Sequence, residues 1–124
     1  MDYFLMTREG WSIPAQDFIE LLKTRWPLVQ VKPSSVPGGF RAIDFQIEMA
    51  HSTVDGALNL VGSTLVYNGM LRDCAEFALW YRSTLPSEAR PVMFFDEGYN
   101  RSIELQDGTT LEDILHAFKS RPAH

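Results

Sequence analysis

The sequence predicts an α+β fold: a single, mostly antiparallel sheet of about five to six strands with about three helices packed on it. Short apolar or alternating segments are joined by links of hairpin length, which favours antiparallel pairing of consecutive strands. Apolar residues recur at helical spacing near residues 14–25, 71–85 and 109–118. With 124 residues the chain can bury one hydrophobic core, so residues 1–124 are expected to form a single globular domain.

The N-terminal third predicts two strands and one helix. Residues 3–6 are an apolar run typical of a short strand. Ser12 is the expected N-cap of the first helix, with Pro14 in its first turn, where a missing N–H costs nothing. Residues 28–31 indicate a second strand, and residues 34–39, rich in Ser, Pro and Gly, a mobile hairpin connection.

The clearest strand pattern covers residues 43–49. Its apolar residues are Ile43, Phe45, Ile47 and Met49, and the polar residues between them are Asp44, Gln46 and Glu48. Such alternation buries one face of a strand and leaves the other polar. Two more strands are predicted over residues 54–60 and 64–67.

The stretch from residue 71 to residue 105 organises the rest of the chain. It begins with a helix, with Asn68 as a possible cap, and Pro86 ends it because the proline ring forbids helical continuation. A continuous apolar run over residues 92–95 then predicts a buried strand, and Phe94 should share one core with Phe45. Residues 96–100 form a polar turn before a last strand at residues 102–105.

The third helix should open with a Thr-x-x-Glu capping box made by Thr109 and Glu112. We expect the helices to cover one face of the sheet. The other face is then expected to be partly open, with Asp44, Gln46 and Glu48 on it. Residues 121–124 are expected to be frayed.

Composition narrows the function classes. Apolar residues make up 45% of the chain and the net charge is −5, which argues against disorder and against a general nucleic-acid binder. No apolar run approaches the roughly 20 residues that a membrane-spanning helix needs. The first residues do not resemble a signal peptide. The lone cysteine, Cys74, leaves no internal disulfide and fits a reducing cytoplasm.

No catalytic or metal-binding pattern is recognisable. The three histidines, His51, His116 and His124, have no partner at ligand spacing. Cys74 lies on the apolar stripe of its helix, where a cysteine behaves as a small hydrophobe. No serine elbow or phosphate-binding glycine motif occurs. The chain is therefore expected to be no enzyme and to need no cofactor.

Two kinds of residue are candidates for binding a partner. Asp96 and Glu97 follow the buried strand and are either a solvated strand end or a partner contact. Among the aromatic residues, Trp80 and Tyr81 have the spacing of core residues. Trp11 and Tyr99 fall in loops, so they are the better surface anchors.

Three segments carry a family resemblance: EFALWYRSTLP at residues 76–86, VMFFDEGYNRSIEL at 92–105 and TTLEDILHAF at 109–118. A Trp-Tyr-Arg before a proline turn, an apolar strand ending in Asp-Glu and a Gly-Thr-Thr start to the last helix make up the likeness. They resemble the C-terminal half of small bacterial immunity proteins, the partners of toxins in contact-dependent inhibition and related polymorphic systems. The resemblance implies a cytosolic, non-enzymatic α+β protein that blocks one cognate toxin domain.

The functional hypothesis is therefore a toxin-neutralising immunity protein with an acidic binding surface. Its expected toxin-binding residues are Asp44, Glu48, Asp96, Glu97 and Tyr99. An acidic surface would be steered onto a basic toxin, such as a nuclease that holds phosphates. Two alternatives stay open: a ligand-binding or catalytic domain with a pocket between sheet and helices, and a structural dimerisation module.

Overall fold

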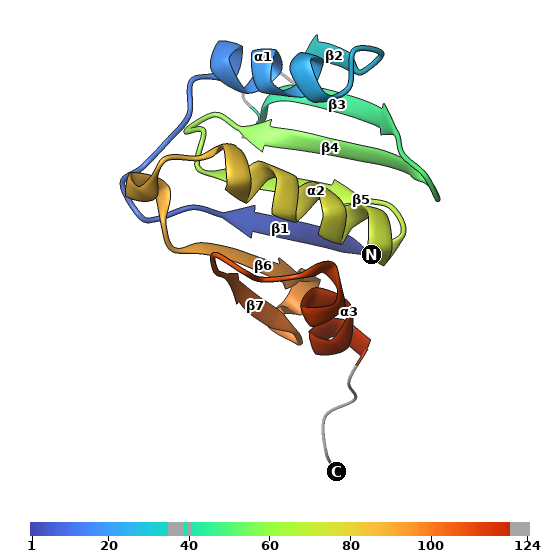
Figure 1. Ribbon diagram of the computed structural model, residues 1–124. Coiled ribbons are helices and arrows are strands. Elements are labelled where there is room, and N and C mark those ends of the chain that lie inside the picture. The colour runs from blue at the N-terminus through green and yellow to red at the C-terminus, as the bar shows by residue number, and fades with distance from the viewer. Residues whose placement is uncertain (35–38, 40, 120–124) are drawn as a thin grey trace.

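Seven strands form one antiparallel sheet in the computed structural model of the chain, which describes residues 1–34, 39 and 41–119 (Figure 1). The strands are β1 (Asp2–Met6), β2 (Gln30–Pro33), β3 (Arg41–Glu48), β4 (Thr53–Asn59), β5 (Thr64–Asn68), β6 (Val92–Asp96) and β7 (Ser102–Leu105). Their spatial order is β2-β3-β4-β5-β1-β6-β7. The α+β class and the antiparallel sheet are confirmed, but the predicted count of five to six strands was too low. Both edge strands, β2 and β7, are only four residues long.

The helices are α1 (Ala15–Arg25), α2 (Leu71–Thr84) and α3 (Leu111–Lys119), with short 3₁₀ turns η1 (Ser87–Ala89) and η2 (Glu97–Tyr99). All three helices lie on one face of the sheet, with α2 across its middle, α1 near β2 and β3, and α3 near β6 and β7 (Figure 1). The predicted order of strands and helices along the chain agrees with the structure. The β2–β3 pairing confirms the hairpin, whose residues 35–38 and 40 lie outside the described part, as do residues 120–124.

The predicted helix caps were wrong in detail. Neither Pro14 before α1 nor Met70 before α2 makes a side-chain cap, so Ser12 and Asn68 do not have the expected roles. The capping box of α3 is displaced by one residue: the Asp113 N–H donates to Thr110 Oγ1 at 3.1 Å, and the Thr110 N–H donates to Asp113 Oδ2 at 2.9 Å. Asp113 takes the role that was expected of Glu112, because the carboxylate of either residue type can accept the hydrogen bond from the backbone N–H.

Aromatic rings fill the space between the sheet and the helices. The Phe77 ring of α2 lies 5.6 Å from the Phe45 ring and 4.8 Å from the Tyr67 ring, measured between ring centres. Tyr67 continues the contact to Phe94 at 6.2 Å. Phe45 and Phe94 are both buried and belong to one core, as predicted.

A buried carboxylate fixes the start of α2. Asp73 is 0% exposed, and its Oδ2 accepts hydrogen bonds from the Ser52 hydroxyl at 2.6 Å and the His51 N–H at 3.1 Å. The Ser52 oxygen in turn accepts from the Met70 N–H at 2.9 Å. The turn between β3 and β4 is thereby tied to the first turn of α2, which holds the central helix in place over the sheet.

Candidate binding face

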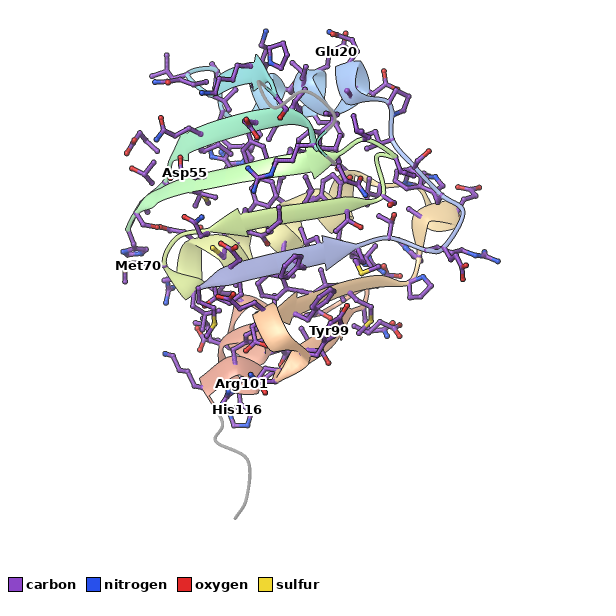
Figure 2. All side chains as sticks on the ribbon, turned by 180° about the vertical axis from the view of Figure 1, so that it is seen from behind. Glu20, Asp55, Met70, Tyr99, Arg101 and His116 are labelled. Carbon is purple, nitrogen blue, oxygen red and sulfur yellow. The ribbon has the colours of Figure 1, made fainter. Side chains whose placement is uncertain are left out.

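The helix-free side of the sheet, called the open face from here on, is the candidate functional surface (Figure 2). Strand register arranges its side chains in rows that cross the strands, because alternate residues point to one face. One row is Gln30, Gln46, Asp55, Asn68 and Asp2; the next is Lys32, Asp44, Ala57, Val66 and Phe4. The expectation of an open polar face that carries Asp44, Gln46 and Glu48 therefore agrees with the strand pairing.

A hollow of about 500 Å³ lies between these two rows. Its floor is backbone, because the side chains of Val31, Phe45 and Tyr67 point to the helix side and Gly56 has none. Its polar lining comes from Asp2, Gln30, Lys32, Arg41, Asp44, Gln46, Asp55 and Asn68. This volume falls within the range of about 300–1,000 Å³ that is usual for small-molecule sites.

A β-bulge adds one cation to the hollow. The register between β3 and β4 shifts between Arg41 and Ile43, so Arg41 pairs with Asn59 while Ile43 pairs with Leu58. In a regular strand Arg41 would share the buried side of Ile43, since residues two apart point the same way. The bulge reverses this, and Arg41 Nη1 lies 3.6 Å from Asp44 Oδ1. Bulges that redirect a side chain are common beside functional sites.

Three stacked rings extend the open face over β1 and β6. The Phe4 and Phe95 rings stack with 5.2 Å between centres, and Phe95 and Tyr99 stack at 4.7 Å. Tyr99 is the outermost ring of this aromatic stack and is 73% exposed. Aromatic side chains that are rigid and exposed are typical anchors of protein interfaces.

The turn that presents Tyr99 has an unusual backbone. Gly98 has a φ of 84° and Tyr99 a φ of 59°, and the second value lies in the left-handed region that a residue with a side chain rarely occupies. Asp96 closes this turn: its N–H donates to the Arg101 carbonyl at 3.1 Å, and its Oδ1 accepts from the Arg101 N–H at 3.0 Å. Asp96 therefore positions Tyr99 through the turn.

The structure separates the five predicted site residues into different roles. Asp44 and Glu48 lie on the open face of β3, while Glu97 and Tyr99 lie beyond β6. Asp96 shares the helix side with Phe94 and is 2% exposed, so it cannot form part of an exposed acidic surface. Four strand spacings of about 4.8 Å separate β3 from β6, or about 19 Å, so the two groups do not adjoin.

Two carboxylates that the sequence interpretation missed bridge this gap. Asp55 of β4 and Asp2 of β1 lie in the same row as Gln46. The Asp2 N–H donates to Glu97 Oε1 at 3.1 Å, which connects the row to η2. The alternation of Val54 and Asp55 could have placed Asp55 on the polar face. The position of Asp2 could not be found this way, because it depends on β1 pairing with both β5 and β6.

Few other side chains in the described part of the fold could take part in chemistry. Cys74 is 0% exposed, and burial, followed by the nearby Asp73 charge, raises the pKa of its thiol to about 12. His51 lies in an exposed turn and His116 on the exposed side of α3. Within residues 1–34, 39 and 41–119, no group of three histidine, cysteine or carboxylate side chains is placed to hold a metal ion.

Buried side chains of the core lie between the sheet and the helices in the described part of the chain. A second hollow of about 520 Å³ lies at the surface beside α1, lined by Trp11, Asp17 and Glu20 on one side and Thr84 and Pro86 on the other. Trp11 is half-buried there, whereas Tyr99 is exposed. Of the two predicted aromatic anchors, Tyr99 is thus the more available to a partner.

Comparisons with protein-family models, curated proteins and solved structures find no match to this chain. Among the helices that the structure describes, none has the length and apolar character needed to cross a membrane.

Proposed function

We propose that this chain is a cytoplasmic bacterial immunity protein that binds a cognate toxin domain through its open face and blocks it. The observation that carries the proposal is the aromatic stack ending at exposed Tyr99, next to the row of polar side chains that includes Asp2 and Asp55, on a sheet face that the described helices leave uncovered. A protein with this surface has the two elements of a strong interface, a rigid aromatic anchor and complementary charge around it.

The acidic part of the proposed surface consists of Asp44, Glu48, Asp55, Asp2 and Glu97. Asp96 does not belong to it, because its side chain is buried. Apart from the Arg41–Asp44 contact, no ion pair joins these carboxylates to a residue in the described part of the chain. Their charges are therefore available to attract a basic partner. A nuclease toxin is the preferred candidate, because a nuclease holds phosphates with cations.

The Tyr99 backbone gives independent support. A left-handed conformation costs a residue with a side chain about 1–2 kcal/mol, and such strain concentrates at functional sites. Here the conformation places the tyrosine ring on Phe95 and leaves most of it exposed. The turn thus maintains an aromatic surface at some cost to the free protein.

The test is binding kinetics with the toxin domain encoded next to this gene, at low and high salt. Reversing two carboxylates in Asp55→Lys/Glu97→Lys should slow association by about tenfold at low salt and reduce its salt dependence. Removing the anchor in Tyr99→Ala should speed dissociation by about 30-fold, as expected for a loss of about 2 kcal/mol.

The matched control is Glu76→Lys/Glu112→Lys, which makes the same charge change on α2 and α3, and should bind like the wild type. If the Tyr99 and Asp55/Glu97 variants also bind like the wild type at both salt concentrations, the open face is not the binding surface. If the toxin domain does not bind at all, the immunity function is wrong.

A further inference from the structure

The charges in the hollow of the open face are separated along its length. Lys32 of β2 and Arg41 of β3 lie at one side, and Asp55 of β4 and Asp2 of β1 at the other. Asp44 lies opposite Lys32 in the register and 3.6 Å from the Arg41 guanidinium, so it neutralises one of the two cations. One positive charge is left at the β2–β3 side, and two carboxylates lie at the β4–β1 side.

Apart from Arg41, the charged side chains at the two sides form no ion pair within the described part of the fold. No ion pair joins Lys32 or Asp55 to a residue that the structure describes, and Asp2 accepts only a 3.3 Å hydrogen bond from the Asn68 side chain. Polar side chains that can bind a peptide backbone lie between the two ends, namely Gln30, Gln46 and Asn68. Val66 supplies an apolar wall.

We infer that this hollow binds a short zwitterionic peptide, with its carboxylate toward Lys32 and Arg41 and its ammonium group toward Asp55. The inference concerns a small ligand and does not depend on the proposed toxin partner. Lys32 and Asp55 lie two strand spacings of about 4.8 Å apart and also in neighbouring rows, two residues of about 3.3 Å apart along the strands, so their Cα atoms are separated by about 12 Å. Three extended residues span about the same distance. A tripeptide therefore matches the separation of charges, whereas a free amino acid is too short to reach both ends.

The backbone floor favours a peptide over a bulky ligand. The hollow lies on the backbone of β3, β4 and β5 between two rows of side chains, so an extended ligand can lie in it across the strands. A Cβ at Gly56 would point to the helix side, toward Phe45 and Tyr67. The depth of the hollow therefore comes from the spacing of the two rows, which Ala57 widens with its small side chain on the Lys32 row.

The experiment is a titration followed by the amide signals of Gln46, Gly56 and Asn68 in nitrogen-15 NMR spectra. Trialanine is the probe, and the controls are N-acetyl-trialanine, which lacks the ammonium group, trialanine amide, which lacks the carboxylate, and alanine, which is too short. We expect saturable shifts with trialanine and affinities at least about tenfold weaker for each control, about 1.4 kcal/mol.

Two variants test the assignment of each end. In Lys32→Gln, trialanine and its amide should bind almost equally, because the carboxylate has lost a cation. In Asp55→Asn, trialanine and its N-acetyl form should become similar. Lys23→Gln and Glu76→Gln make the same changes on the helices and should leave all affinities unchanged.

Three results would overturn the inference. Trialanine could give no saturable shift at the three amides. The two capped peptides could bind as tightly as trialanine, which would mean that the charges are not recognised. The helix variants could weaken binding as much as the hollow variants, which would place the peptide elsewhere. None of these results bears on toxin binding, which the kinetic experiment with the Tyr99 variant measures separately.

Discussion

Gly56 is a position where one methyl group should have a large effect on stability. A Cβ placed there would lie 2.5 Å from Phe45 Cζ, 2.9 Å from Phe45 Cε1 and 2.7 Å from Tyr67 Cβ. These residues flank Gly56 on both neighbouring strands, in direct register. The two aromatic residues therefore close over the glycine and take the space that a side chain would need.

The surroundings leave the Phe45 ring little room to move away. It stacks on Phe77 with an interplanar angle of 8° and contacts the edge of Phe18 at 5.6 Å. Overpacking of a core costs about 1–3 kcal/mol. Replacing a strand glycine with alanine normally gains about 0.5–1 kcal/mol. We therefore expect Gly56→Ala to lower the free energy of unfolding by about 1–2 kcal/mol.

The assay is urea denaturation of Gly56→Ala, Phe45→Leu and the double variant, with the free energy of unfolding extrapolated to water. Leucine lacks the two Phe45 atoms that would clash, so the double variant should be more stable than the sum of the single changes predicts, by about 1 kcal/mol. An additive cycle, or a Gly56→Ala protein as stable as the wild type, would refute the steric argument.

Three further predictions concern one core ring, a buried thiol and an exposed carboxylate. Phe94→Ala should cost about 3–5 kcal/mol in urea denaturation, because the ring is fully buried among other rings; a loss below about 1 kcal/mol would contradict its place in the core. Cys74 should react slowly with thiol reagents, and rapid labelling of the native protein would contradict this expectation. Its pKa of about 12 also means that the contribution of the buried thiol to stability is present below pH 9 and is lost as the pH rises toward 12. The hydrogen bond from Arg82, followed by the Arg90 charge, lowers the pKa of Asp107 below its usual 3.8. The ionised carboxylate therefore stabilises the fold above pH 3.8, and this contribution is lost as the pH falls through the lowered pKa. Asp107→Asn should flatten the acid side of the stability profile, and an unchanged profile would exclude the contact.

The order of elements could be predicted because its signals are local. Alternation defined β3, and helical spacing defined α2 and α3. The neighbours of β1 could not be predicted, since its pairing with β5 and β6 joins segments 58 or more residues apart. The hydrogen bonds of Asp73 likewise link α2 to a turn about 20 residues earlier, and no sequence motif marks that contact.

Asp96 shows a different kind of failure. It is two residues from Phe94, so the strand period already placed it on the buried side. The continuous apolar run of β6 concealed that period, because Phe95 points to the open face and is nevertheless buried by Phe4 and Tyr99. The position of Arg41 in the hollow was missed for a related reason. Only the bulge in β3 turns its side chain to the open face, and the sequence of that segment contains no signal for a bulge.

The backbone at Tyr99 leads to a last prediction, which separates the role of its ring from that of its conformation. Tyr99→Ala and Tyr99→Gly both remove the ring that stacks on Phe95, so both should weaken binding to the proposed toxin domain to the same extent. They differ in the left-handed φ of 59°, which glycine adopts without strain and alanine does not. Glycine should therefore give a free energy of unfolding about 1 kcal/mol higher than alanine. This reverses the usual order, since glycine ordinarily destabilises a folded position relative to alanine. Urea denaturation of the two variants measures this difference in the free energy of unfolding. The matched control pair is Ser102→Ala and Ser102→Gly in the extended strand β7, where the alanine variant should be the more stable. If alanine is also the more stable residue at position 99, the turn does not hold a strained tyrosine, and the support that this strain gives to a binding role is lost.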